Sequence, residues 1–231
     1  MKKFLNAFLL LAAFVAAALP AHAAPLKRET LIERLDTCEA ILQDLQSSTK
    51  TAIPVEVLRE AKGIVIVNQV QAGFFFGIKD GYAVAMVRRP NGKWSLPVFL
   101  RAGEASFGLQ AGVKALNTVL VLRDEQTANL LLKSRFNFGA EAKATAGVRA
   151  AEKEAVTKQL IEGSNVLVYT LQEGLYVGAA IKTGFMQPND EANRIFYDTT
   201  HRTPELLFSD WVTPPPETRY IMDYVTRLTS Q

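Results

Sequence analysis

The sequence has 231 residues, of which 48% are hydrophobic and 21% are charged, values that are ordinary for a soluble globular protein. This length allows one large domain or two small ones, with enough chain for a substantial core. The formal net charge is +3 and falls to about +1 without Lys2 and Lys3, a balance that argues against a nucleic-acid partner.

The first 23 residues have the parts of a secretory signal peptide. Lys2 and Lys3 precede an apolar run at residues 4–19, and Ala21-His22-Ala23 forms a cleavage site. The apolar run is shorter than the roughly 20 residues that span a bilayer, which favours cleavage over an uncleaved anchor. We expect residues 1–23 to be removed and the protein to lie in the periplasm or cell envelope, or to be secreted. No cysteine stands at the cleavage point, so we do not expect a lipoprotein.

Glycine and proline divide the rest of the chain into three parts. All 14 glycines lie in the interval 63–184, and Pro90 and Pro97 are the only prolines within it. We predict a single domain over residues 24–231, made of a helical arm (24–62), a glycine-rich β core (63–184) and a second helical arm (185–231).

A helix is predicted at residues 27–46, because apolar residues recur along it at spacings of four and three. They form one stripe: Leu31, Leu35, Cys38, Leu42 and Leu45. The opposite face is acidic, whereas a membrane-surface helix normally carries Lys and Arg there. This pattern favours a helix docked on its own domain. Cys38 is the only cysteine, so no internal disulfide forms, and we interpret it as a small buried hydrophobe. A second short helix is predicted at residues 54–62.

The β core contains short apolar runs separated by turn residues. The predicted strands are residues 63–70, 74–79, 82–89, 93–100, 104–111, 115–123, 165–171 and 175–183, with one helix at 125–134. Pro90-Asn91-Gly92 is a hairpin signal, and the short connections favour antiparallel pairing. Gly108 and Gly112 are interpreted as structural positions at bends. The predicted fold class is α+β, with a curved or barrel-like, mainly antiparallel sheet between the helical arms.

The C-terminal arm is predicted to be helical at residues 189–197 and 203–208, with a last helix after Pro214-Pro215-Pro216. Asp190 and Glu191 stand in a first turn, where acidic residues favour the helix dipole. His201 is the only histidine beyond the leader, and its polar neighbours indicate a surface position. We expect no catalytic residue, cofactor or metal site, although a site built from scattered carboxylates and a hydrolase with an unrecognised site stay open as alternatives.

Several short segments, taken in order, match the pattern of a known family. They are Ala61-Lys62-Gly63-Ile64-Val65-Ile66, Trp94-Ser95 with Pro97, Ser106-Phe107-Gly108-Leu109-Gln110-Ala111-Gly112, Ala146-Gly147, Tyr169, Gly174-Leu175-Tyr176-Val177-Gly178, Asp190-Glu191-Ala192-Asn193 with Tyr197, and Glu205-Leu206-Leu207-Phe208. Together they resemble the SYLF-domain family of lipid-binding proteins, over about residues 31–228. The leader points to an exported, bacterial-type member.

The sequence also departs from the family pattern. Gly103-Glu104-Ala105 replaces the usual glycine pair, and Val148 stands where a proline is usual. Eukaryotic relatives look like phosphoinositide binders that engage actin, but an exported protein would meet neither. The resemblance therefore implies a tendency to bind anionic lipid, without that specificity or that partner.

Charge supports this expectation independently. The interval 63–184 holds 14 basic and 9 acidic residues, whereas the two arms together carry a net charge of −4. The candidate lipid-binding residues are cations around the hairpin and the tryptophan beside it: Arg88, Arg89, Lys93, Trp94 and Arg101. Cations near an anionic surface contribute about 1 kcal/mol each. Core packing is the alternative for Trp94.

The sequence thus predicts an exported, non-enzymatic domain that binds anionic lipid or membrane surfaces. An envelope module that binds or scaffolds proteins, without lipid specificity, is the alternative. The sequence identifies no protein partner.

Overall fold

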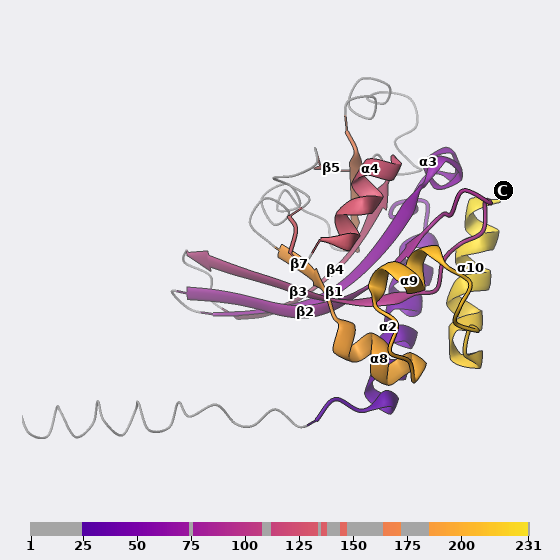
Figure 1. The fold of residues 1–231 in the computed structure, drawn as a ribbon. Helices are drawn as coiled ribbons and strands as arrows, with labels where there is room; N and C mark the ends of the chain where they lie inside the picture. Colours follow the sequence, from indigo (N-terminus) through magenta and orange to yellow (C-terminus); the bar gives the residue numbers. More distant parts are fainter. Residues whose placement is uncertain are drawn as a thin grey trace, which may run out of the picture.

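The computed structural model describes residues 25–73, 76–107, 112–133, 135–137, 144–146, 164–171 and 185–230 (Figure 1). Its centre is a seven-stranded sheet in the order β5-β6-β4-β1-β2-β3-β7. The strands are β1 (Gly63–Gly73), β2 (Phe76–Val87), β3 (Val98–Phe107), β4 (Gly112–Leu122), β5 (Ala144–Ala146), β6 (Val166–Thr170) and β7 (Phe185–Pro188). All pairs are antiparallel except β5 with β6. The α+β class is confirmed, but the sheet is open.

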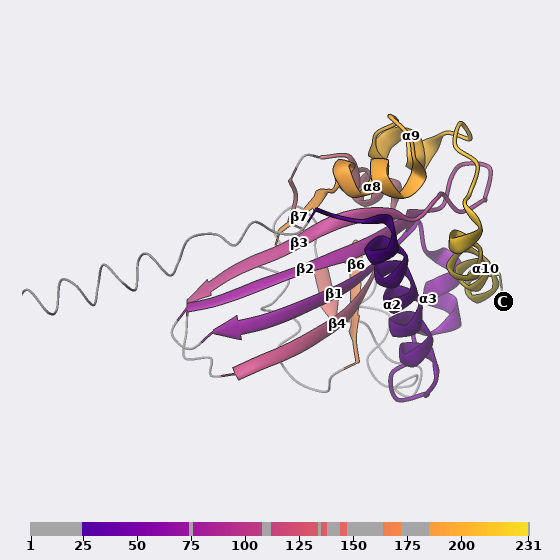
Figure 2. The same ribbon diagram turned by 90° about the horizontal axis from the view of Figure 1, so that it is seen from below.

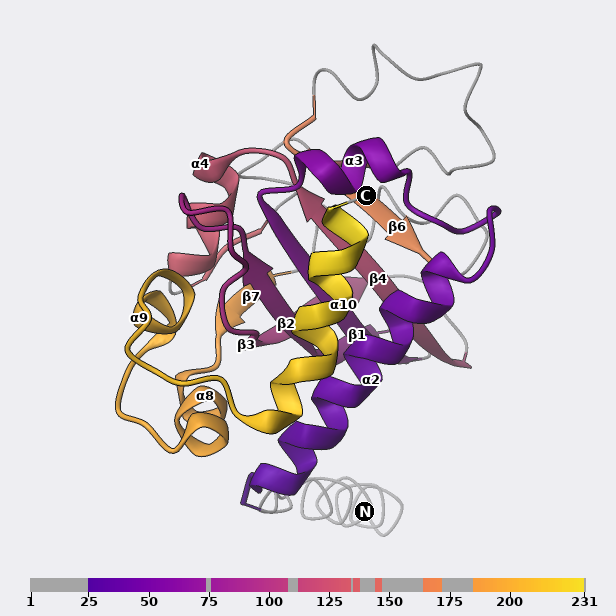
Figure 3. The same ribbon diagram turned by 90° about the vertical axis from the view of Figure 1, so that its right-hand side faces the viewer.

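Helices lie at both ends of the chain, as predicted, and short helical segments follow β4, where a helix was also predicted. They are α2 (Arg28–Gln46), α3 (Val55–Glu60), α4 (Glu125–Ala128), α8 (Asp190–Tyr197), α9 (Thr203–Phe208) and α10 (Arg219–Thr229), with short 3-10 helices η1 (Asn129–Leu132) and η3 (Pro216–Thr218). Figure 3 shows α2 and α10 side by side over one face of the sheet. The second arm begins with a strand, since β7 pairs with β3 before α8 starts.

The strands are longer than their sequence pattern indicates. Residues 74–79 and 82–89 were predicted as separate strands, but residues 76–87 form the single strand β2. Gly81 is paired inside it, and a Cβ atom there would lie 2.2 Å from the carbonyl oxygen of Asn68. The glycine therefore permits a close backbone approach rather than a turn.

The same error affects the next strand. The prediction placed strands at residues 93–100 and 104–111, whereas β3 runs unbroken through Gly103. The hairpin signal before it is confirmed, because Gly92 has a φ of 80° and its N–H donates to the carbonyl of Arg89 at 2.9 Å. The predicted strand at 175–183 and Gly108 lie outside the described residues.

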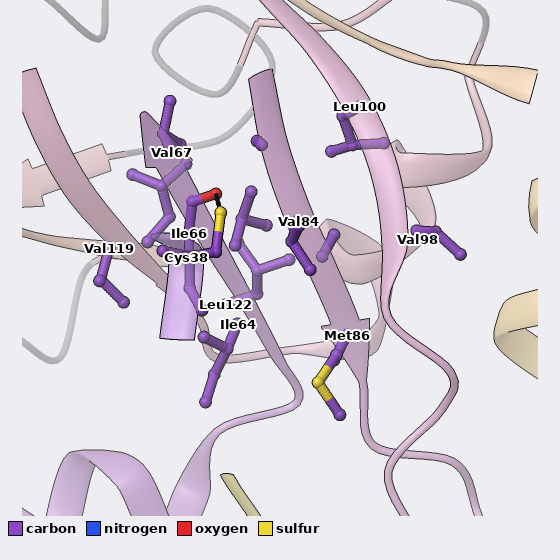
Figure 4. Packing of buried hydrophobic residues seen from close by; sticks show 14 of the residues in the cluster. Cys38, Ile64, Ile66, Val67, Val84, Met86, Val98, Leu100, Val119 and Leu122 are labelled. Atoms are coloured by element: carbon purple, nitrogen blue, oxygen red, sulfur yellow. Dashed lines mark hydrogen bonds between the residues drawn. The ribbon is translucent and has the colours of Figure 1, made fainter. Parts of the chain in front are cut away.

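The predicted stripe of the first helix is buried against the sheet. Leu31, Leu35, Cys38, Leu42 and Leu45 all belong to the core, together with Ile41. The Cys38 thiol lies 3.8 Å from the carbonyl oxygen of Ile66 on β1 (Figure 4). The helix is thus docked on its own domain.

Candidate functional site

The hairpin turn between β2 and β3 holds four of the five predicted site residues. Trp94 is buried, and its Nε1 donates to Oγ1 of Thr229 on α10 at 2.9 Å. The tryptophan therefore joins the turn to the last helix, as the core-packing alternative expects.

Arg89 fixes the other side of the turn. Its side chain is buried, and its Nε donates to the carbonyl of Leu207 at 2.7 Å while Nη2 donates to that of Leu206 at 3.2 Å. Nη1 forms an ion pair with Asp210. These contacts hold the turn against the end of α9, so this guanidinium is engaged in intramolecular contacts.

Arg88 also makes internal contacts. Its guanidinium lies 5.3 Å from the centre of the Trp94 ring and donates to the carbonyls of Arg59 and Thr229, at 2.9 and 3.2 Å. Desolvation lowers the pKa of Arg88, but an arginine stays protonated. Of the four residues, only Lys93 is exposed. The turn therefore presents one exposed cation, where the sequence suggested three.

Arg101 lies elsewhere, on β3. Its Nη2 is 3.3 Å from Oε2 of Glu191 on α8, and both side chains are more than half exposed. Such a surface pair contributes about 0 to 1 kcal/mol, so its partners exchange readily. The pairing of strands places Arg101 beside Tyr82, and the guanidinium of Arg34 on α2 lies 4.8 Å from the centre of the Tyr82 ring. Arg101 and Arg34 therefore share one face of the sheet.

Beyond this row the four central strands continue past the helices. Figures 1 and 2 show the ends of β1, β2, β3 and β4 extending away from α2 and α8. The pairing of β1 with β2 continues through this part of the sheet, from Gln69 with Gly81 to Gly73 with Gly77.

The sequence analysis missed an exposed aromatic surface at the end of α9. Phe208 at the end of α9 is 42% exposed, and Trp211 after it is 70% exposed. The Trp211 ring lies 5.4 Å from the His201 ring, which is part-exposed. A tryptophan in a sequence usually indicates a core position, so only the structure revealed that Trp211 is exposed.

The described residues hold no group of three or more His, Cys, Asp or Glu side chains that could bind a metal ion. Burial raises the pKa of the Cys38 thiol to about 12, which is unsuited to a nucleophile at neutral pH. None of the described helices is both long and apolar enough to cross a membrane. The features that stand out in the described part of the chain are the exposed aromatic side chains of Phe208 and Trp211, which are typical of the surface of a binding domain.

The comparisons with known proteins agree with that class. A family model, Ysc84, described as "Las17-binding protein actin regulator", matches residues 103–228. This is more than half of the chain, and the chain belongs to this family. The resemblance to SYLF-domain proteins is thereby confirmed, and the family is one of binding or regulatory modules.

The relatives are longer proteins from eukaryotes. Protein YSC84 of Saccharomyces cerevisiae is 30% identical over 71% of this chain and 35% of its own length. LAS seventeen-binding protein 3 of the same species is 28% identical over 71% of this chain and 36% of its own. The human SH3 domain-containing YSC84-like protein 1 is 27% identical over 71% and 47%. The chain thus spans a third to a half of these relatives, and no solved structure matches it.

Proposed function

We propose that this chain is a non-enzymatic domain that is exported through its leader and binds anionic lipid or membrane surfaces. The observation that carries the proposal is the concentration of positive charge in the middle of the sequence, where the interval 63–184 holds 14 basic and 9 acidic residues while the two arms together carry a net charge of −4. The excess of basic residues in the interval 63–184 supports an anionic partner.

Co-sedimentation tests this function directly. Residues 24–231 are mixed with anionic or zwitterionic phospholipid vesicles at low ionic strength. We expect the protein to pellet with the anionic vesicles and to be released as salt rises, because screening weakens the attraction. Equal recovery in the supernatant with both vesicle types would refute lipid binding.

Export needs a separate measurement, since the leader lies outside the described residues. We expect the intact mass of the protein from a cell-envelope fraction to correspond to a chain that begins at Ala24. A chain that keeps Met1 in that fraction would contradict cleavage.

A protein partner is the second candidate function. The exposed pair Phe208 and Trp211 favours it, and the relatives carry names that describe Las17 binding. Here Trp211→Ser should abolish capture of an envelope protein by the purified domain, while Tyr220→Ser, at another exposed aromatic on α10, should keep it. A domain with only this function would ignore vesicle composition.

A further inference from the structure

We infer that the chain meets an anionic membrane with the end of α9, where Trp211 and Phe208 enter the headgroup region. The exposed cations Lys93 and Arg202 contact the lipid phosphates beside them. This inference rests on the proposed lipid binding and adds the side chains that make the contact. Figure 3 shows α9 apart from α2, so the first helix takes no part in it.

Two aromatic side chains at this end are open to solvent. Trp211 is 70% exposed and Phe208 is 42% exposed, and the His201 ring just before α9 lies 5.4 Å from the Trp211 ring. A tryptophan left in water forgoes the free energy that its burial would release. Tryptophan is also enriched where membrane meets water, because its ring is apolar while its N–H needs a polar partner. The headgroup region meets both requirements of Trp211.

The segment that carries Trp211 is held in place by the protein itself. Arg89 donates to two carbonyls at the end of α9 and forms an ion pair with Asp210, the residue before Trp211. The N–H of Trp211 donates to Oγ of Ser209 at 3.4 Å. Because these contacts already order the backbone, binding costs little additional conformational entropy.

Cations accompany the two aromatic residues. Arg202 is exposed just before α9, and Lys93 is exposed in the turn that Arg89 joins to α9. Each acidic residue of the stretch 198–211 interacts within the protein: Asp210 with Arg89, Glu205 with the N–H of Arg202, and Asp198 with Arg28. Lys93 and Arg202 therefore remain available to lipid phosphates, and their charge favours an anionic surface.

The size of this surface favours lipid over protein. Large hydrophobic side chains are exposed at four of the described positions: Leu132, Phe208, Trp211 and Tyr220. Only Phe208 and Trp211 belong to the end of α9. A specific protein interface takes about 20 to 30 residues from each partner, whereas a shallow membrane contact needs one or two aromatic rings and nearby cations.

The first test uses the tryptophans as probes. The chain has two, of which Trp94 is buried and Trp211 is exposed. We expect the emission of the wild-type domain to shift to the blue on vesicles of phosphatidylglycerol in phosphatidylcholine. Lipids brominated near the headgroup end of their chains should quench it. Trp211→Phe leaves only Trp94 and should remove both responses.

The second test measures affinity for the same vesicles. Trp211→Ser should weaken binding about tenfold, because the burial of one aromatic side chain is lost. Tyr220→Ser, at an exposed aromatic on α10, should change it less than about twofold. Arg202→Gln should weaken binding about fivefold at low salt. Lys50→Gln, at an exposed cation after α2, should have little effect. Circular dichroism checks that each variant is folded.

The outcomes separate this inference from the function on which it rests. If the wild-type domain ignores anionic vesicles, the proposed function itself fails. If it binds them while the emission stays unchanged, or if Trp211→Ser binds normally, lipid binding stands and this site is wrong. Equal losses in Arg202→Gln and Lys50→Gln would indicate a general charge effect and also overturn it. A blue shift that appears with an envelope protein and not with vesicles would assign Trp211 to a protein partner.

Discussion

The indole Nε1 of Trp94 and Oγ1 of Thr229 are 2.9 Å apart, although 135 residues separate them in the chain. The threonine hydroxyl in turn donates to the carbonyl of Val225 on the same helix. This contact joins the end of α10 to the hairpin turn. Trp94, which the sequence suggested as a membrane contact, is therefore a packing residue of the last helix. We expect Trp94→Phe to lower the free energy of unfolding by about 1 to 3 kcal/mol, because a buried hydrogen-bond partner is lost.

Chemical denaturation measures this change. Trp211→Phe is the matched control, because Trp211 is 70% exposed and its replacement should cost less than about 0.5 kcal/mol. Similar costs for the two tryptophans would show that the contact with Thr229 does not stabilise the fold.

Arg89 and Lys93 stand four residues apart in the same turn but should behave differently. Arg89→Met leaves the carbonyls of Leu206 and Leu207 without their donor, which we expect to cost about 2 to 4 kcal/mol of stability. Lys93 is exposed, so Lys93→Met should lower the free energy of unfolding by less than about 0.5 kcal/mol. Urea titrations of the two variants decide the point, and an equal cost would contradict a structural role for Arg89.

Lys93 also separates two hypotheses about where the membrane lies. If the turn meets anionic headgroups, Lys93→Ser should weaken vesicle binding by about fivefold at low salt. If the membrane instead meets Arg101 on β3, the effect should be less than twofold, because Lys93 lies in the turn before that strand. Co-sedimentation beside Arg101→Gln shows which of the two variants loses binding.

The first helix should behave as part of the core. Leu35 on α2 is buried in the core. Leu35→Ala should lower the free energy of unfolding by about 2 to 5 kcal/mol, because it leaves a cavity as well as removing apolar contacts. Glu33→Ala, exposed on the same helix, is the control. A Leu35→Ala variant with an unchanged melting temperature and no vesicle binding would show that α2 is a membrane anchor after all.

Gly81 should tolerate no side chain. A Cβ there would lie 2.2 Å from the carbonyl oxygen of Asn68, and backbone atoms inside a sheet cannot move aside. We expect Gly81→Ala to cost about 3 kcal/mol through overpacking. At Gly92 a Cβ meets nothing within 4 Å, so Gly92→Ala should cost only about 1 kcal/mol, for its positive φ. Thermal melts that rank the two variants in the opposite order would refute this reading of Gly81.

Cys38 predicts a pH dependence of stability. Burial raises the pKa of its thiol from an ordinary value of 9.0 to about 12, so the folded state favours the neutral form. The resulting stability is fully present below about pH 9 and is lost as pH rises toward 12. We expect the difference in free energy of unfolding between wild type and Cys38→Ala to shrink from pH 8 to pH 11. A constant difference over that interval would show that the pKa of the thiol is the same in the folded and unfolded states.

The sequence alone determined the local features. The periodic stripe from Leu31 to Leu45 defined α2 and its buried face, and Pro90-Asn91-Gly92 defined the tight turn. The quoted family segments were enough to place the chain among SYLF-domain proteins. These features are readable because each depends on residues that are close together in the chain.

Only the tertiary structure decided how distant residues meet. The sequence suggested that Arg88 and Arg89 are free cations. In the structure they bind residues of α3, α9 and α10, and the partners on α9 and α10 are more than a hundred residues away in the chain. Gly81 and Gly103 were predicted to separate strands, because glycine weakens an isolated strand. In the structure both are paired with neighbouring strands inside β2 and β3.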